Sequence, residues 1–170
     1  MQVVVEHPRP ARWGRHLLLR ARRLVEQLDL SGVALAVTLT TDPRIRRLNR
    51  RWRRRDRPTD VLSFPGGPPL PGWPGPFLLG DVVISLDTAR REASAPGRTL
   101  AGELDRYLAH GLLHLLGHDH RRSADARRMA ALEDRLLGAP GMVQAALLRH
   151  PPSLNRLRRR RAASRRRTFW

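Results

Sequence analysis

The chain has 170 residues and a mass of 19.4 kDa, the size of a single domain. Its 33 basic residues are all arginine and stand against 15 acidic ones, which gives a formal net charge of +18. A GC-rich genome is the first explanation for the absence of lysine. The charge nevertheless indicates nucleic acid as a partner, because guanidinium groups stay charged and bind phosphate through paired hydrogen bonds.

Cysteine is absent, which excludes disulfides, thiolate chemistry, iron–sulfur clusters and cysteine-ligated zinc. No stretch of about 18 apolar residues occurs, so we expect no transmembrane helix. The beginning of the chain, MQVVVEHPRP, lacks the basic region and long apolar stretch of a signal peptide. We therefore expect a cytoplasmic protein that does not contact membranes.

Strand and helix patterns alternate along the chain. In chain order the patterns predict a strand at Gln2–Glu6, a helix at Arg12–Leu28, a strand at Val33–Thr40, a helix from Asp42 to about Trp52, strands at Thr59–Phe64 and Leu79–Leu86, a short helix at Asp87–Ala95, a helix from Leu100 with Thr99 as its N-cap, and a helix at Ser123–Leu137. Residues 65–76 include ten Pro or Gly and predict a loop. The order indicates an α/β (α+β) fold, with helices packed on a small mixed β-sheet.

The positive charge is concentrated at the end of the chain. Residues 149–170 contain nine arginines, no acidic residue and few apolar side chains. Such a segment cannot bury enough apolar surface to order itself. We therefore predict a folded domain at residues 1–148 and a disordered, arginine-rich tail at residues 149–170.

Four histidines lie within eleven residues, in the segment HGLLHLLGHDH at residues 110–120. His110 and His114 are four residues apart, so they share one face of the predicted helix. The leucines at 104, 108, 112 and 115 fall on the opposite side. The pattern predicts a central helix with one packed face and one face that binds a metal ion.

The third ligand must come from beyond Gly117, because three histidines in line on a straight helix cannot converge on one ion. Ligand nitrogens around tetrahedral zinc lie only about 3.4 Å apart. A glycine at 117 can adopt positive φ, end the helix and turn the chain back. This favours His110, His114 and His120 as the ligands, with His118 as the alternative. Three neutral imidazoles leave one coordination position for water, which is typical of a catalytic zinc site.

The spacing H-x3-H-x2-G-x2-H resembles the zinc motif of the metzincin proteases. Those enzymes carry a glutamate after the first histidine as the general base, and this chain has Gly111 there. A zinc peptidase-like hydrolase is therefore a weaker alternative. A non-catalytic protein in which the zinc is structural is another.

The segment from Asn49 to Pro65 combines an arginine cluster with a predicted strand. Pro65 at the end of that strand is compatible with a sheet edge, which offers unpaired backbone groups to an extended ligand. Arginines beside such an edge are most often a solvated surface, but next to a metal site they would hold phosphate.

Together with LGDVVIS (residues 79–85) and residues 110–120, this segment makes the chain similar to the YbeY family of single-strand-specific bacterial endoribonucleases. The resemblance covers roughly residues 33–138. It implies one zinc ion on His110, His114 and His120, and a functional arginine at Arg53. It also implies trimming of 16S rRNA ends, a role in ribosome quality control and contact with the small ribosomal subunit. The family usually has an aromatic residue, often tyrosine, at the position of His118.

Four further residues are candidates for orienting a ligand or binding substrate. Asp119 and Glu103 carry carboxylates that can orient a ligand histidine. His118 lies beside the predicted site, and Ser63 lies in the strand after the arginine cluster. No general base is evident, and the sequence fits either water or an RNA 2′-hydroxyl as the nucleophile.

The arginine-rich tail gives a prediction that the family does not supply. If several tail arginines contact phosphate, truncation after Arg149 will leave metal binding and the chemical step unchanged. It will weaken RNA binding at low salt and flatten the dependence of log affinity on log salt by about 0.7 per lost contact. Binding isotherms at three or more salt concentrations, full length against truncated, measure this. Superimposable slopes would show that the tail does not engage RNA.

Overall fold

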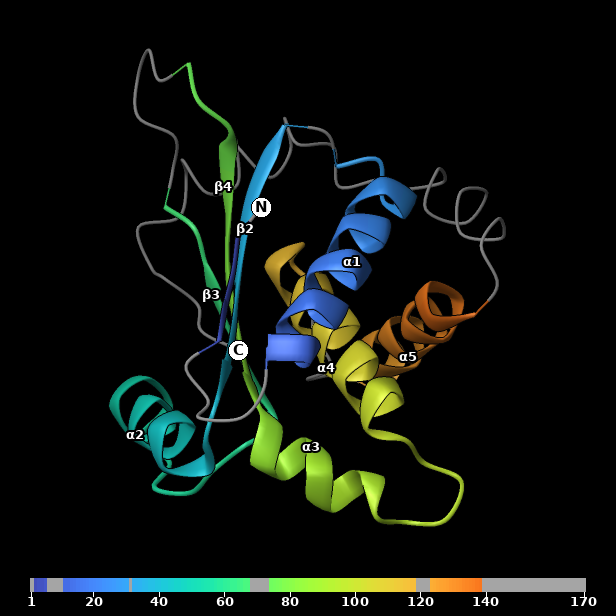
Figure 1. Cartoon of the computed structure of the whole chain (residues 1–170). Helices are drawn as coiled ribbons and strands as arrows, with labels where there is room; N and C mark the ends of the chain where they lie inside the picture. The colour runs from blue at the N-terminus through green and yellow to red at the C-terminus, as the bar shows by residue number, and fades with distance from the viewer. Residues whose placement is uncertain (1, 6–10, 31, 68–73, 119–122, 139–170) are drawn as a thin grey trace.

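A mixed four-stranded sheet forms the centre of the computed structural model, which describes residues 2–5, 11–30, 32–67, 74–118 and 123–138 (Figure 1). In spatial order the strands are β1 (Gln2–Val5), β2 (Val33–Thr40), β4 (Phe77–Ser85) and β3 (Val61–Pro65). The first three are parallel, and β3 runs antiparallel to β4 at the edge of the sheet. The mixed sheet and the edge position of the strand that ends at Pro65 are as predicted.

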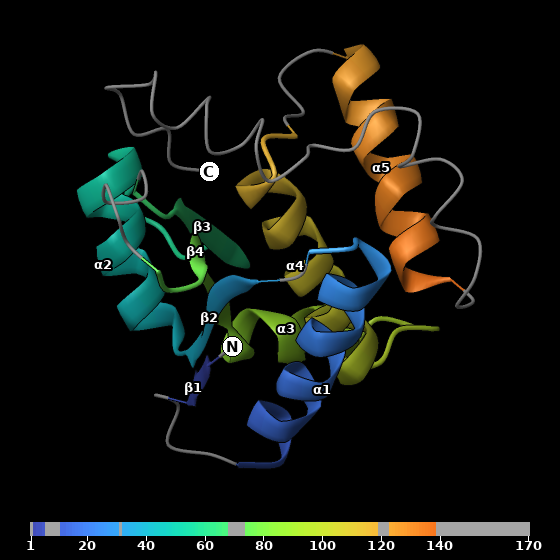
Figure 2. The same cartoon turned by 90° about the horizontal axis from the view of Figure 1, so that it is seen from above.

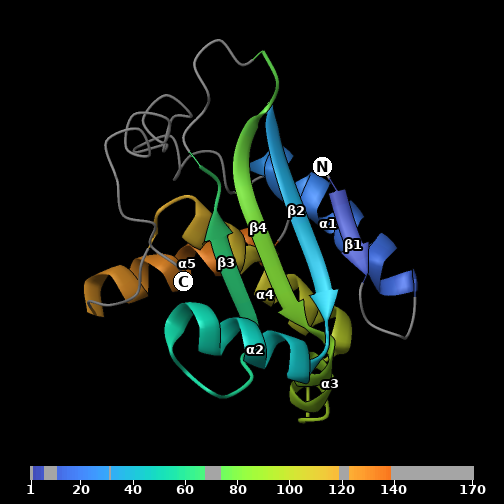
Figure 3. The ribbon, with the colours of Figure 1, turned by 90° about the vertical axis from the view of Figure 1, so that its left-hand side faces the viewer.

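Helices cover the two faces of the sheet unequally (Figures 2 and 3). Helices α1 (Ala11–Gln27) and α4 (Leu100–Leu115) lie on one face, and α5 (Ser123–Leu137) packs against α4. Helix α2 (Asp42–Arg53) lies on the other face, and the short α3 (Leu86–Ala93) continues directly from β4. The predicted metal-binding helix is therefore the central helix of the larger layer.

Helix α4 is buried on almost every side. Its leucine stripe, the predicted packed face, has side chains that are 0–2% exposed: Leu104, Leu108, Leu112 and Leu115. On the opposite side His114 is only 4% exposed, whereas the His110 side chain is 30% exposed. Helix α5 packs beside α4, and its Glu133 contacts His110. Of the histidine pair, His114 is therefore shielded from water and His110 is partly accessible.

Sequence and structure agree closely on element boundaries. Thr99 caps α4 by accepting a hydrogen bond from the Gly102 N–H, as predicted. The structure differs in placing the start of β4 two residues earlier, at Phe77, and the start of β3 two residues later, at Val61. The predicted tail at residues 149–170 lies outside the described residues. Within the part of the chain that is described, no helix is long and apolar enough to cross a membrane.

The amino end of α2 is anchored by one carboxylate. Asp42 Oδ1 accepts hydrogen bonds from Ser85 Oγ (2.5 Å) and Thr88 Oγ1 (2.7 Å), and Oδ2 pairs with Arg91. Burial alone would raise the pKa of Asp42, but the three hydrogen bonds and the Arg91 charge outweigh it and lower the pKa. These contacts fix α2, and the arginine segment after it, to the end of β4 and to α3.

Replacing Asp42 with asparagine will lower the free energy of unfolding by about 1.5–3 kcal/mol at pH 7, the range for hydrogen bonds to a charged group. Because the folded-state pKa is lowered, this stabilisation is complete above the ordinary value of 3.8 and is lost as pH falls through the folded value. Urea unfolding at pH 7 and near pH 3 will show the difference from wild type shrinking in acid. The control is Asp56→Asn, which removes an exposed ion pair with Arg46. An Asp42→Asn variant no less stable than this control contradicts the prediction.

Candidate metal centre

His110 and His114 present their Nε2 atoms to each other, 3.0 Å apart. They lie one turn apart on α4, with ring centroids 4.5 Å apart and ring planes at 83°. His114 is buried, and the His110 side chain is 30% exposed. The structure thus brings two of the three predicted ligands together, with their nitrogens near the roughly 3.4 Å spacing of ligands around tetrahedral zinc.

The other nitrogen of each ring is committed to an acceptor. His110 Nδ1 lies 2.6 Å from Glu133 Oε1, and His114 Nδ1 lies 2.9 Å from the carbonyl oxygen of His118. A carboxylate and a carbonyl accept hydrogen bonds, so each Nδ1 must carry the proton. Each neutral imidazole then has its lone pair on Nε2.

Two lone pairs facing each other at 3.0 Å repel unless a positive centre lies beside them. A proton or a metal ion can supply it. An Nδ1–H bond to carboxylate or carbonyl, with Nε2 directed at the metal, is also the usual arrangement of metal-ligating histidines. The donor chemistry of the pair therefore fits a metal such as zinc.

A turn built on Gly117 supplies the partner of His114. Gly117 has φ of +88° and donates its N–H to the His114 carbonyl, and the His118 N–H bonds to the Leu113 carbonyl. This pair of bonds is the Schellman motif that ends helices at a left-handed residue. The predicted helix stop at Gly117 is confirmed, and the turn brings the His118 carbonyl back onto the His114 ring.

The side chain of His118 has a different environment from those of the pair. Its Nε2 atom is buried with no hydrogen-bond partner in the described residues. Burial lowers the pKa of His118, which favours the neutral ring. The predicted third ligand, His120, and the candidate Asp119 lie outside the described residues. Within the described residues, no group of three or more His, Asp or Glu side chains is placed to hold a metal ion.

Gly111 lets α4 approach β3 and β4 closely. A Cβ at this position would lie 2.7 Å from Val82 Cγ1, 3.0 Å from Ser63 Oγ and 3.2 Å from Val61 Cγ2. Ser63, which is 1% exposed, donates a hydrogen bond to the Gly111 carbonyl at 2.9 Å. Ser63 thus holds the edge strand to the histidine helix, and its burial leaves no surface for the predicted contact with substrate.

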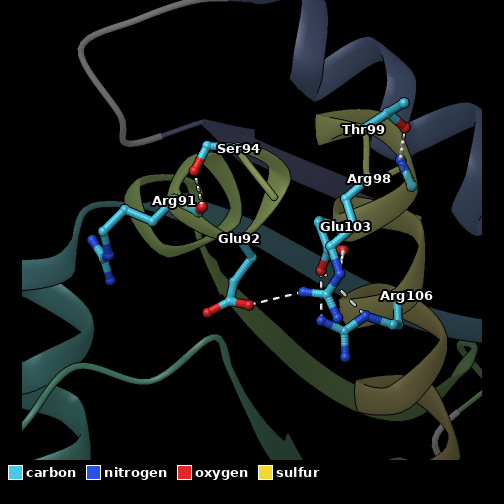
Figure 4. Close-up of polar contacts among 8 residues, drawn as sticks. Arg91, Glu92, Ser94, Arg98, Thr99, Glu103 and Arg106 are labelled. Carbon is cyan, nitrogen blue, oxygen red and sulfur yellow. Dashed lines mark hydrogen bonds and ion pairs between the residues drawn. The ribbon is translucent and has the colours of Figure 1, made fainter. Parts of the chain in front are cut away.

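Glu103 does not approach the histidine pair. Its carboxylate is 6% exposed and forms ion pairs with Arg98 (3.5 Å) and Arg106 (2.5 Å), as Figure 4 shows. Seven residues of helix separate it from His110, about 10 Å along the axis. The carboxylate that orients His110 is instead Glu133, which comes from α5 and was not predicted from the sequence.

The segment that carries Arg53 is held by Asn49. The Asn49 side chain, 2% exposed, donates to the Arg57 carbonyl at 2.7 Å, and the main-chain carbonyl of Asn49 accepts from the Arg54 and Arg55 N–H groups. Arg53, the last residue of α2, is half-buried. Asp60 then accepts a hydrogen bond from the Val61 N–H as β3 begins. Arg53 is therefore carried on a fixed segment that leads directly into the edge strand beside α4.

Comparison with known proteins gives the family of the chain. The model of the family described as endoribonuclease YbeY matches residues 9–140. The chain belongs to this family. The resemblance read from residues 33–138 is thereby confirmed and extends over most of the chain.

Relatives named endoribonuclease YbeY cover most of the chain. The one from Myxococcus xanthus is 59% identical over 145 residues, which are 85% of this chain and 49% of the relative. This chain thus spans about half the length of that relative. The relative from Anaeromyxobacter dehalogenans is 54% identical over 86% of this chain and 75% of its own length. That from Thermus thermophilus is 44% identical over 81% of this chain and 99% of its own.

A solved structure supports the fold. The solution structure of a Thermotoga maritima protein superposes with a TM-score of 0.57 and covers 89% of this chain and 95% of its own. Its sequence identity to this chain is 23%, so this likeness concerns the fold alone.

Removing the Glu133 carboxylate will weaken metal binding. Glu133→Ala leaves His110 Nδ1 without its acceptor, and loss of such a partner costs on the order of 10–100-fold in metal affinity. Glu133→Gln, which keeps an acceptor oxygen, will lose less. Zinc affinity measured by competition with a chelator tests this, with circular dichroism to verify folding. The matched control is Asp134→Ala, at the exposed neighbouring position of α5. Equal zinc affinities for Glu133→Ala and Asp134→Ala would contradict the role of Glu133 in orienting His110.

Proposed function

We propose that this chain is a zinc-dependent endoribonuclease that cuts single-stranded RNA. The observation that supports this most directly is the pair of facing Nε2 atoms at 3.0 Å, each on a ring whose Nδ1 is already committed. Family membership adds the substrate class, because the relatives are named endoribonucleases. We further propose that it acts in the cytoplasm, in maturation of the 16S rRNA 3′ end and in ribosome quality control, in contact with the small ribosomal subunit.

His110, His114 and His120 would hold the zinc ion. When bound, zinc polarises a phosphoryl oxygen and lowers the pKa of a coordinated water. Glu133 and the His118 carbonyl keep the two ring protons on Nδ1, so that Nε2 is available. The burial of His114 limits water around the site and so strengthens charge interactions there.

Arg53 would bind the phosphate at which cleavage occurs. A guanidinium forms paired, charge-assisted hydrogen bonds with phosphate oxygens, and these strengthen as negative charge develops on the phosphate. The network of Asp42 and the bonds of Asn49 hold the segment that carries Arg53, so little ordering is needed when RNA binds. The edge strand β3 lies beside this segment and can align an extended RNA strand.

A peptidase reading of the same histidine spacing is disfavoured by the packing at Gly111. The position that carries the glutamate base in metzincins faces Val82, Ser63 and Val61, with no room even for a Cβ. The general base for peptide hydrolysis therefore has no place on this helix.

Incubation of the zinc-loaded chain with labelled single-stranded RNA tests the proposal. We expect internal cleavage that a chelator abolishes and that His114→Ala removes together with zinc binding. Duplex RNA of the same sequence will be cut far more slowly. A 2′,3′-cyclic phosphate on the product identifies the 2′-hydroxyl as nucleophile, and its absence identifies water. Zinc binding without cleavage of any single-stranded RNA would favour a non-catalytic ribosome-binding protein and contradict the proposal.

In the same assay Arg53→Ala will keep its zinc but cleave at least tenfold more slowly. Loss of a charge-assisted contact that strengthens in the transition state costs roughly 1.5–3 kcal/mol. Arg55→Ala removes the same charge from an exposed neighbour and serves as the matched control. A wild-type rate in Arg53→Ala and in the combined alanine variant of Arg53, Arg54 and Arg55 would refute the role of this segment.

A further inference from the structure

We infer that Arg106 forms a second phosphate subsite, which binds the phosphodiester next to the one that is cleaved. This inference rests on the proposed function, since it takes RNA as the substrate. The subsite would set the register of the RNA strand along α4.

The helix places Arg106 on the same face as the histidine pair. Arg106 precedes His110 by four residues, as His110 precedes His114. Each step of four is about 6 Å along the axis and about 40° around it. The three side chains therefore form one row on α4, and Arg106 stands one turn from the pair, on the scale that separates successive phosphates of an extended strand.

The guanidinium is held in place but retains hydrogen-bonding capacity. Its Nε and Nη2 donate to Glu103 Oε2, at 3.2 and 2.5 Å, and its plane lies over the Tyr107 ring, 4.9 Å from the centroid. Within the described residues, the third guanidinium nitrogen, Nη1, forms no hydrogen bond. The Arg106 side chain is 40% exposed, whereas Glu103 is 6% exposed. A buried carboxylate thus fixes an accessible cation, which lowers the entropic cost of binding an anion.

Arg106 also lies close enough to Asp60 for the two charges to interact. Burial lowers the pKa of Arg106, but the hydrogen bond and charge of Glu103, together with the charges of Tyr107 and Asp60, outweigh this and raise it. Asp60 stands between the Arg53 segment and β3. Arg106 accordingly lies near Asp60, the residue that comes between the Arg53 segment and the start of the edge strand.

A simpler reading is that Arg106 only neutralises Glu103. Arg98 provides the comparison, because it pairs with the same carboxylate (3.5 Å) and is 41% exposed (Figure 4). It precedes α4, whose first residue is already ten residues, or about 15 Å, from His110 along the axis. If charge balance at Glu103 were the only role, loss of Arg98 and loss of Arg106 would have similar effects.

The experiment measures cleavage of a single-stranded RNA oligonucleotide and, in chelator, its binding at several salt concentrations. We expect Arg106→Ala to raise KM about tenfold with little change in kcat. We also expect it to reduce the slope of log affinity against log salt by about 0.7, which corresponds to one phosphate contact. Arg98→Ala will change neither. Arg106→Lys, which keeps the charge, will recover part of the affinity.

Oligonucleotides with one neutral methylphosphonate linkage, placed on either side of the cleaved linkage, identify the contact. At one of the two positions, the methylphosphonate will lower the affinity of the wild type about tenfold relative to the unmodified oligonucleotide. At that position it will not lower the affinity of Arg106→Ala, which has already lost the contact. Equal effects of Arg106→Ala and Arg98→Ala, or an added loss in Arg106→Ala at both positions, would overturn the inference. If Arg106→Ala does not fold, Arg106→Gln replaces it in the same comparison.

Failure of the inference is distinguishable from failure of the proposed function. Wild-type cleavage of RNA with an unaffected Arg106→Ala variant overturns the subsite alone. A wild-type chain that neither binds nor cleaves single-stranded RNA overturns both.

Discussion

The close contact between α4 and the strands β3 and β4 at Gly111 is the constraint on which the site depends. With no Cβ at this position, the helix backbone comes near enough for Ser63 to bond its carbonyl. That contact fixes the edge strand beside the row of Arg106, His110 and His114. The position of the histidine pair relative to β3 is therefore set by backbone packing and does not rely on flexible side chains.

The few acidic side chains are used to place cations and histidines. Asp42 anchors α2, Glu103 holds two arginines, and Glu133 orients His110. Asp105 likewise joins α1 to α4 through His16 and Arg20. The 33 arginines outnumber the 15 acidic residues, so the chain keeps a formal net charge of +18 even with these acids paired.

Local patterns predicted most of the fold because its elements have clear periodicity and end signals. The leucine spacing gave α4, Thr99 its start, Gly117 its stop and Pro65 the edge strand. The partner of His110 was not predicted, because Glu133 lies 23 residues away and three acids in α5 look equivalent in sequence. A signal did exist: Glu133 falls on the same side of α5 as the buried Met129 and Leu136, where a carboxylate needs a partner. Glu103 was assigned to the site by helix phase alone, which carries no information on the arginines that bind it.

The two histidines are oriented by acceptors of different kinds, so mutations affect the two contacts differently. The acceptor for His110 is a side chain, so one codon change at Glu133 can strengthen, weaken or replace it. The acceptor for His114 is a main-chain carbonyl positioned by a left-handed turn, which any amino acid except proline would supply at position 118, because the N–H of residue 118 bonds to the Leu113 carbonyl. The carbonyl contact therefore tolerates substitutions at position 118. It depends on glycine at position 117, because the turn needs a positive φ there. The orientation of His114 thus depends on the backbone conformation of the turn, and that of His110 depends on the identity of one side chain.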